Sequence, residues 1–305
     1  MGADNRTDTE PYASEHGGKV ISMAINIRQR LEFLTGDDAW SLSANRFPPN
    51  ADPELFYTIL KEYDLQGMHI GRFISSFDGF IRAGLGSSAS SAVCLIAALM
   101  RIKGILLDKA SIAQEAWRIE TQNLGWFGGK QDQYASSFGG LNLIEFGKTV
   151  TVNPLEEKSA EKLLQWSFLT YVGGARSSHP IQKTFESPTE EQKKIFDAMK
   201  YKIVAARVWL ETGYMSGVGE LLDEAWNLKK QSNPAVSNER IDELYTYARE
   251  NGAVGGKLLG AGQGGYMYFV VPPERRSAFK TALRKKGMEE IDFSIDWNGV
   301  EARIL

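Results

Sequence analysis

The chain has 305 residues, of which 43% are hydrophobic and 24% charged, and its formal net charge is −3. This composition is typical of a globular protein with a sizeable core, and the balanced charge argues against a general nucleic-acid binder. The polar N-terminus lacks a signal-peptide core and no apolar run reaches the roughly 18 residues of a membrane span, so we expect a cytoplasmic protein. The single cysteine, Cys94, excludes an intrachain disulfide and is expected to be a buried structural thiol.

The first half of the chain is expected to mix strands with helices. Asp52 and Pro53 are typical of a helix N-cap and first helical position, and Asp108 or Ser111 is expected to cap a later helix. In chain order, the expected elements are a short helix or turn at 10–16, a strand region at 16–34, a helix at 53–65, a strand at 67–76, helices at 88–103 and 108–124, a short helix and a strand within 126–146, and a strand at 149–155.

The second half changes character near residue 160, so we divide the chain into domains at 1–160 and 161–305. Strands and helices do not alternate as regular units, which favours an α+β fold over a doubly wound α/β sheet. The expected elements of the second half are a strand at 166–174, two or three long helices within 189–250, a glycine-rich turn that leads into a strand at 254–271, a helix at 272–287 and strand character at 288–305.

A glycine- and serine-rich stretch precedes the helix expected at 88–103. It consists of Gly84, Leu85, Gly86, Ser87, Ser88 and Ala89. The stretch matches the dinucleotide fingerprint G-x-G-x-x-A, but the buried apolar strand that a parallel sheet requires does not precede it. Glycines at a helix N-terminus also form phosphate cradles, in which backbone N–H groups and the helix dipole bind the anion. A tight turn before a closely packed helix is the third interpretation, and this stretch alone does not separate the three.

Two further stretches could carry chemistry. Residues 260–265 also fit G-x-G-x-x-G, but they lead into a strand instead of opening a helix. Lys130 and Asp132 follow a glycine pair; Asp132 can accept or orient a hydroxyl proton, and Lys130 can lower the pKa of that hydroxyl or hold a phosphate. Glu120 and Ser88 together can complete a Mg²⁺ site. The competing structural interpretations are helix capping by Asp132 and a solvated Glu120.

Three motifs in chain order resemble those of the GHMP small-molecule kinases. They are "GLGSSAS", "GGKQDQYASSFGG" and "GGKLLGAGQGGYMYFV". Within that superfamily the chain is most similar to sugar kinases of the D-glycero-D-manno-heptose 7-phosphate kinase type, with fucokinase-like enzymes as neighbours. The resemblance covers nearly the whole chain from Thr7 onward. It implies a two-domain α+β fold, with a ribosomal-protein-like N-terminal domain, a ferredoxin-like C-terminal domain, and ATP and sugar bound between them.

The resemblance also implies a reaction and the residues that perform it. The loop at 84–89 would wrap the phosphates of ATP, Ser88 and Glu120 would hold Mg²⁺, and Asp132 would be the catalytic base for a sugar hydroxyl, with Lys130 nearby. The product would be a phosphorylated sugar or sugar phosphate, no nucleic acid or membrane would take part, and a homodimer is one of the oligomeric states left open. The implied substrate contacts are Asp8, Gly128, Gly129, Arg176, Ser177, Gly262 and Gly264.

The chain departs from the family pattern at its start. The family begins with a strand that runs into a glycine-rich segment ending in Thr-Asp, whereas here only "MGADNR" precedes Thr7 and Asp8. Without that strand we expect a frayed Asp8, an unpaired sheet edge and weakened sugar binding. The alternative function is therefore a catalytically impaired, kinase-like protein that binds a sugar or nucleotide. A dinucleotide oxidoreductase is the third and least favoured hypothesis.

Overall fold

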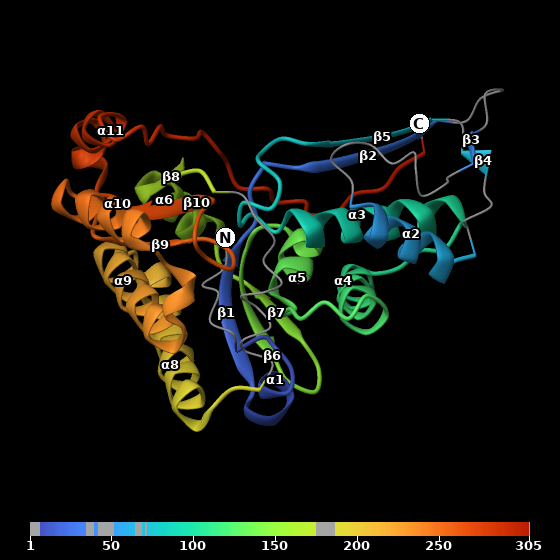
Figure 1. Cartoon of the computed structure of the whole chain (residues 1–305), viewed down its shortest axis with the longest axis horizontal. Helices are drawn as coiled ribbons and strands as arrows, with labels where there is room; N and C mark the ends of the chain where they lie inside the picture. The colour runs from blue at the N-terminus through green and yellow to red at the C-terminus, as the bar shows by residue number, and fades with distance from the viewer. Residues whose placement is uncertain are drawn as a thin grey trace.

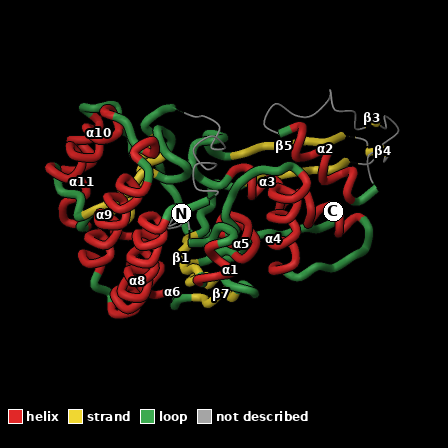
Figure 2. Tube along the Cα trace, turned by 60° about the horizontal axis from the view of Figure 1, so that its bottom comes forward, coloured by secondary structure: helices red, strands yellow, loops and turns green. Residues whose placement is uncertain are grey.

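The computed structural model describes residues 7–34, 40–41, 52–64, 69–70, 72–174 and 187–304. The helices of the C-terminal half gather on one side of the molecule, and the helices between residues 53 and 138 gather on the other (Figure 1). The sheet that contains the first strand lies between these two groups, and the turned view shows the same arrangement (Figure 2). The fold is α+β, as predicted.

Local capping chemistry starts the helices of the N-terminal half. The Asp52 carboxylate accepts the N–H groups of Glu54 and Leu55, and the Asp108 carboxylate accepts the N–H of Ser111, as predicted for both caps. The elements of this half are α1 (Tyr12–His16), β1 (Gly18–Met23), β2 (Gln29–Leu34), β3 (Trp40–Ser41), α2 (Pro53–Glu62), β4 (His69–Ile70), β5 (Arg72–Phe77), α3 (Ser87–Ile102), α4 (Lys109–Arg118), a π-helical turn (Ile119–Asn123), α5 (Gln131–Phe138), β6 (Leu141–Phe146) and β7 (Thr151–Pro154).

The central sheet has the order β1-β6-β7, and both pairs are antiparallel. Strand β1 is an edge strand in the part of the sheet that the structure describes. Its outer side is nevertheless flanked by the N-terminal segment, because Thr7 Oγ1 accepts the Lys19 N–H and donates to the Lys19 carbonyl, both at 3.2 Å. Helix α8 (Glu190–Thr212) also packs against β1. The edge expected to be unpaired is therefore covered by other parts of the chain.

The C-terminal half is built on a second antiparallel sheet with the order β8-β10-β9. Its chain order follows the β-α-β-β-α-β pattern of ferredoxin-like folds, except at the end. The strand character predicted at 288–305 was wrong for the residues described: that segment makes only two isolated bridges, from Glu290 to Thr170 and from Ile295 to Ile25. The elements of this half are α6 (Glu157–Trp166), β8 (Ser167–Tyr171), α8, α9 (Met215–Ser232), α10 (Glu239–Glu250), β9 (Gly255–Leu258), β10 (Tyr266–Val270) and α11 (Arg276–Arg284).

One hydrophobic cluster joins the two halves. It contains Met23 and Leu141 from the central sheet, Ile203 from α8, and Leu169 and Tyr266 from the second sheet, all of them buried. Because dense apolar packing resists deformation, this shared core fixes the two sheets relative to one another. The boundary predicted at residue 160 falls inside α6, which packs against α8 and α9; the division into 1–160 and 161–305 stays a prediction.

Candidate active site

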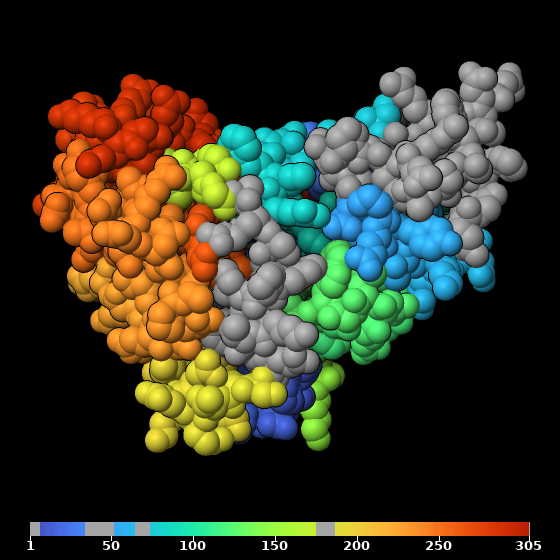
Figure 3. Space-filling view, viewed as in Figure 1, coloured from blue at the N-terminus to red at the C-terminus, as the bar shows by residue number. Residues whose placement is uncertain are grey.

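A cleft of about 520 Å³ lies where the two halves meet. Its walls include the loop 84–89, the start of α5 and the loop 259–264, together with Asp8 and Glu120. The cyan residues near position 80 reach the surface between the red C-terminal residues and the lighter blue residues of α2 (Figure 3). The volume is in the range of small-molecule sites, and the lining is unusually polar for such a site.

The loop 84–89 brings backbone N–H groups to the floor of the cleft. Gly84 and Gly86 have φ angles of 97° and 67°, a region that favours glycine, and Gly86 is the N-cap residue of α3. The hydroxyl of Ser87 accepts the N–H of Arg82 at 3.1 Å, which fixes the start of the turn. All six residues from Gly84 to Ala89 line the cleft, so the positive end of the α3 dipole faces it. Such a geometry can hold an anion, and we refer to residues 84–89 as the anion cradle.

The second glycine-rich loop supports the first one. A Cβ atom at Gly260 would lie 2.5 Å from the Gly84 Cα, and a Cβ at Gly84 would lie 2.6 Å from the Leu259 carbonyl oxygen. A Cβ at Gly265 would lie 2.1 Å from the carbonyl oxygen of Ala83, which accepts the Tyr266 N–H at 3.0 Å. The two backbones therefore touch without intervening side chains, so the loop from β9 to β10 holds the anion cradle in place.

Ser88, which is exposed at the start of α3, forms a polar pair with the buried Glu120. The Ser88 hydroxyl donates to Glu120 at 2.8 Å, and the Gln133 amide donates to the other carboxylate oxygen. Glu120 lies on the π-helical turn and is only 7% exposed, so its interpretation as a solvated helix residue was wrong. Burial raises the pKa of the Glu120 carboxyl to about 7, against the lowering effect of the two donors, and the charge of Asp132 raises it further.

Asp132 lies in the first turn of α5 and lines the cleft. A Cβ at Gly86 would lie 3.1 Å from the Asp132 Cγ, so the carboxylate stands directly against the anion cradle. It does not cap the helix: Lys130 is the N-cap residue and makes no capping bond with its side chain. A carboxylate that faces bound phosphates can receive the proton of a hydroxyl that attacks them.

Comparisons with known proteins agree with this geometry. The descriptions "GHMP kinases N terminal domain" and "GHMP kinases C terminal" match residues 54–140 and 210–288. The D-glycero-alpha-D-manno-heptose 7-phosphate kinase of Campylobacter jejuni is 34% identical over 72% of this chain and 67% of its own length. The mevalonate kinase of Pyrococcus horikoshii is 31% identical over 68% of this chain and 61% of its own length.

A solved structure supports the same fold. The D-glycero-D-manno-heptose 1-phosphate kinase from Bacteriodes thetaiotaomicron superposes with a TM-score of 0.73 at 24% identity, covering 98% of this chain and 94% of that one. The chain belongs to the GHMP kinases. Membership in this kinase family implies ATP as the phosphoryl donor.

Lys130 lies apart from the cleft of this GHMP kinase. Its ammonium forms an ion pair with Glu10 at 2.8 Å and lies 4.3 Å from the centroid of the Trp117 ring. The residue is 6% exposed and, among the residues described, is absent from the cleft lining that includes its neighbours Gly129 and Gln131. The contacts described for Lys130 do not support the prediction that it acts beside Asp132. They hold the start of α5 in position instead.

Asp8 is held firmly rather than frayed, contrary to the expectation from its place in the chain. It is 1% exposed, its carboxylate accepts the Gln131 N–H at 3.0 Å, and its carbonyl accepts the Lys130 N–H at 3.3 Å. A Cβ at Gly129 would lie 1.9 Å from the Asp8 carboxylate, so only glycine admits this approach. Asp8 therefore reaches the cleft through a close contact with the glycine pair.

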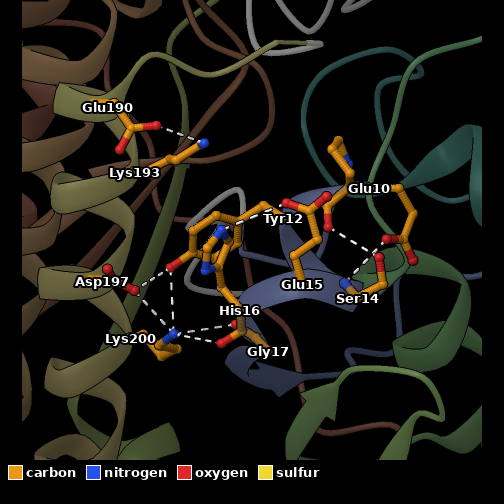
Figure 4. Close-up of polar contacts among 11 residues, drawn as sticks. Glu10, Tyr12, Ser14, Glu15, His16, Gly17, Glu190, Lys193, Asp197 and Lys200 are labelled. Carbon is orange, nitrogen blue, oxygen red and sulfur yellow. Dashed lines mark hydrogen bonds and ion pairs between the residues drawn. The ribbon is translucent and has the colours of Figure 1, made fainter.

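The segment after Asp8 is anchored to the C-terminal half through α8 (Figure 4). The Tyr12 hydroxyl donates to Asp197 at 2.5 Å, and the Lys200 ammonium donates to the His16 carbonyl at 2.8 Å. Tyr12 is 2% exposed and packs edge-on against Phe196. The segment that carries Asp8 is thus held between the central sheet and α8.

The remaining predicted contacts divide into two groups. Gly128, Gly262 and Gly264 line the cleft, and a Cβ at Gly264 would lie 2.6 Å from the Gly174 carbonyl oxygen. Arg176 and Ser177 lie outside the described residues. No helix in the described part of the chain is long and apolar enough to cross a membrane.

The sequence analysis missed several residues that line the site, and two of them matter most here. Arg82 and Gln133 both line the cleft, and Gln133 donates directly to Glu120. Gln133 follows Asp132 by one position, so a hydrogen-bonding partner for a buried carboxylate could have been sought there. Arg82 gave a weaker signal: a long cation two residues before a glycine turn is common on exposed surfaces.

Proposed function

We propose that this GHMP kinase is an ATP-dependent sugar kinase that transfers the γ-phosphoryl group to a hydroxyl of a heptose phosphate or a related sugar. The observation that carries the proposal is Asp132, a carboxylate in van der Waals reach of the glycine cradle, on the wall of a cleft of small-molecule size. The identity to a heptose 7-phosphate kinase and the fold of a heptose 1-phosphate kinase support the substrate class.

The polar groups beneath the cradle fit Mg²⁺ as well as ATP. That ion takes oxygen ligands, commonly one or two carboxylates together with substrate phosphates, and Ser88 and Glu120 provide a hydroxyl and a carboxylate. Burial raises the pKa of the Glu120 carboxyl to about 7, and a cation bound there would favour its ionised form. Bound there, Mg²⁺ would neutralise phosphate charge; the described residues contain no group of three or more His, Cys, Asp or Glu that would hold it without the phosphates.

Phosphoryl transfer needs positioning and charge stabilisation more than covalent chemistry. The N–H groups at the α3 N-terminus bind the anion, and Asp132 orients the attacking hydroxyl and takes its proton. Asp8 faces the same cleft and can accept hydrogen bonds from sugar hydroxyls. Lys130 acts one step away: by pairing with Glu10 and contacting Trp117 it fixes the turn that carries both Asp132 and the contact to Asp8.

The test is a panel of acceptors assayed for ADP release in the presence of MgATP. It contains D-glycero-D-manno-heptose 7-phosphate, the corresponding 1-phosphate, fucose, galactose and mevalonate. We expect the highest kcat/KM with a heptose phosphate and identify the modified hydroxyl by NMR of the product. A preference for mevalonate would overturn the sugar assignment, and binding of ATP and sugar without turnover would favour the impaired alternative, which the kinase relatives do not support.

A further inference from the structure

Arg82 has a backbone conformation that is costly for an arginine. Its φ angle is +57°, in the left-handed region, and only two other described non-glycine residues, Asp64 and Gln263, share such an angle. The conformation is held because the Arg82 N–H donates to the Ser87 hydroxyl at 3.1 Å. A glycine would adopt the same turn without strain and keep the same hydrogen bond, so the turn itself does not require a side chain here.

The side chain of Arg82 extends along the cleft. It is 61% exposed and pairs with Asp52 at 3.1 Å, and both residues line the cleft beside the cradle. Asp52 uses its other carboxylate oxygen to cap α2, so the cap does not depend on Arg82. Exposed ion pairs of this kind contribute little to stability, and this pair does not explain why a strained position carries an arginine.

The charge of the cleft is a second reason to expect that Arg82 binds a ligand. Carboxylates predominate on its described lining, with Glu120 and Asp132 close to the cradle, whereas the cations on that lining are Arg28 and Arg82. Arg28 is engaged with Asp296 at 2.7 Å and lies 3.7 Å from Glu301. Of these two cations, Arg28 contacts two carboxylates, whereas Arg82 pairs with Asp52 alone among the described residues. An anionic ligand at the cradle could therefore replace Asp52 as the partner of Arg82.

We propose that Arg82 binds the terminal phosphates of the nucleotide, exchanging the Asp52 carboxylate for phosphate oxygens when ATP occupies the cleft. The planar guanidinium suits this role because it makes two parallel hydrogen bonds to a phosphate and keeps its charge at every working pH. The strain at Arg82 then serves to aim a cation at the cradle from the turn that forms it. This inference rests on the proposed function, since it assumes that the cleft takes ATP.

The test compares Arg82→Gly with wild type in calorimetric titrations with MgATP and with AMP, and in acceptor kinetics. We expect ATP affinity to fall by about tenfold or more, since a charge-assisted contact is lost, and AMP affinity to change by less than about twofold. Thermal unfolding of the apo protein should move to a higher Tm, because glycine relieves the strained φ angle. Arg82→Lys should recover part of the ATP affinity.

Asp64→Gly is the matched control, because Asp64 has a φ angle of +54°, follows α2 and does not line the cleft. It should raise the Tm without changing ATP affinity. Equal losses for ATP and AMP, or unchanged ATP affinity in Arg82→Gly, would overturn the role of Arg82 while leaving the kinase assignment intact. A loss confined to the KM of a sugar phosphate would place Arg82 on the acceptor instead, which also contradicts the proposal. Failure of the wild-type protein to bind ATP would overturn both proposals.

Discussion

The two glycine-rich loops of this kinase share a sequence pattern and differ in the element to which each one leads. The loop at 84–89 opens helix α3 and presents its N–H groups to the cleft, whereas the loop at 260–265 connects β9 to β10, packs against the first loop and forms another wall of the cleft. Both fit a G-x-G-x-x-[GA] pattern. Glycines of both loops make room for the other backbone, but only the loop that is followed by a helix directs a helix N-terminus at the cleft.

If the first loop binds the reacting phosphates, substitution of its neighbour Asp132 should lower the reaction rate more than any other change proposed here. Asp132→Asn keeps the size of the side chain and removes the proton acceptor, so kcat should fall by about 10²–10⁴-fold. ATP affinity, measured by calorimetry, should change little because the cradle remains. Turnover near the wild-type rate in a clean Asp132→Asn preparation would show that Asp132 is not the proton acceptor. The first loop would then have no stronger link to the chemistry than the second.

The packing role of the second loop is tested at Gly260. Gly260→Ala places a methyl group against the Gly84 Cα at a φ angle of +70°, so both strain and overlap should lower the free energy of unfolding, by about 2–4 kcal/mol. The ATP KM should rise as well, because the cradle is displaced. Gly287→Ala is the control: its φ angle is +72° and nothing lies within 4 Å, so only the strain of about 1–2 kcal/mol should appear in denaturant unfolding. Equal effects at both positions would contradict the loop contact.

The buried carboxyl beneath the first loop predicts a pH dependence. Burial raises the Glu120 pKa from 4.5 to about 7, so the folded state binds a proton that the unfolded state releases between these values. The stability contribution of this group is therefore full below pH 4.5 and is lost as the pH rises through 7, by up to about 3 kcal/mol. Without Mg²⁺, Glu120→Gln should flatten the loss of stability between pH 5 and pH 8 in chemical unfolding. Parallel curves for the variant and wild type would contradict it.

The smallest effect is expected at Ser88. Ser88→Ala removes one oxygen ligand, so the Mg²⁺ concentration for half-maximal activity should rise by about tenfold while the fold is retained. Ser91→Ala is the matched control, because its hydroxyl donates to the Ser87 carbonyl at 2.8 Å and, among the described residues, Ser91 is not part of the cleft lining. An unchanged Mg²⁺ requirement in Ser88→Ala would argue that the hydroxyl only orients Glu120.

Local signals made much of the fold predictable. The caps at Asp52 and Asp108, the helix after the cradle and the three long helices between 189 and 250 all depend on residues a few positions apart. The prediction of strand character at 288–305 failed because a strand does not depend on local residues alone. The alternating residues of this segment suggest a strand, but strand formation needs a partner along its length, and the fold offers only single bridges at Glu290 and Ile295.

The candidate site was predictable in its motifs and not in its contacts. Ser88, Glu120 and Asp132 were found from motif order, and the structure brings them together under one loop. The pairing of Lys130 with Glu10 and the burial of Glu120 depend on how distant segments pack, which no local pattern encodes. The same holds for Arg82, whose importance lies in a backbone angle.

The contact between Gly84 and Gly260 has a consequence for how this sequence can vary. Neither position tolerates a side chain while the other backbone stays where it is, so a substitution at one cannot be rescued by a smaller residue at the other. Sequence changes at these two positions are therefore coupled between the two halves of the chain. A chimera that joins the N-terminal half of this chain to the C-terminal half of a relative should work only where the relative also keeps glycine at the position of Gly260.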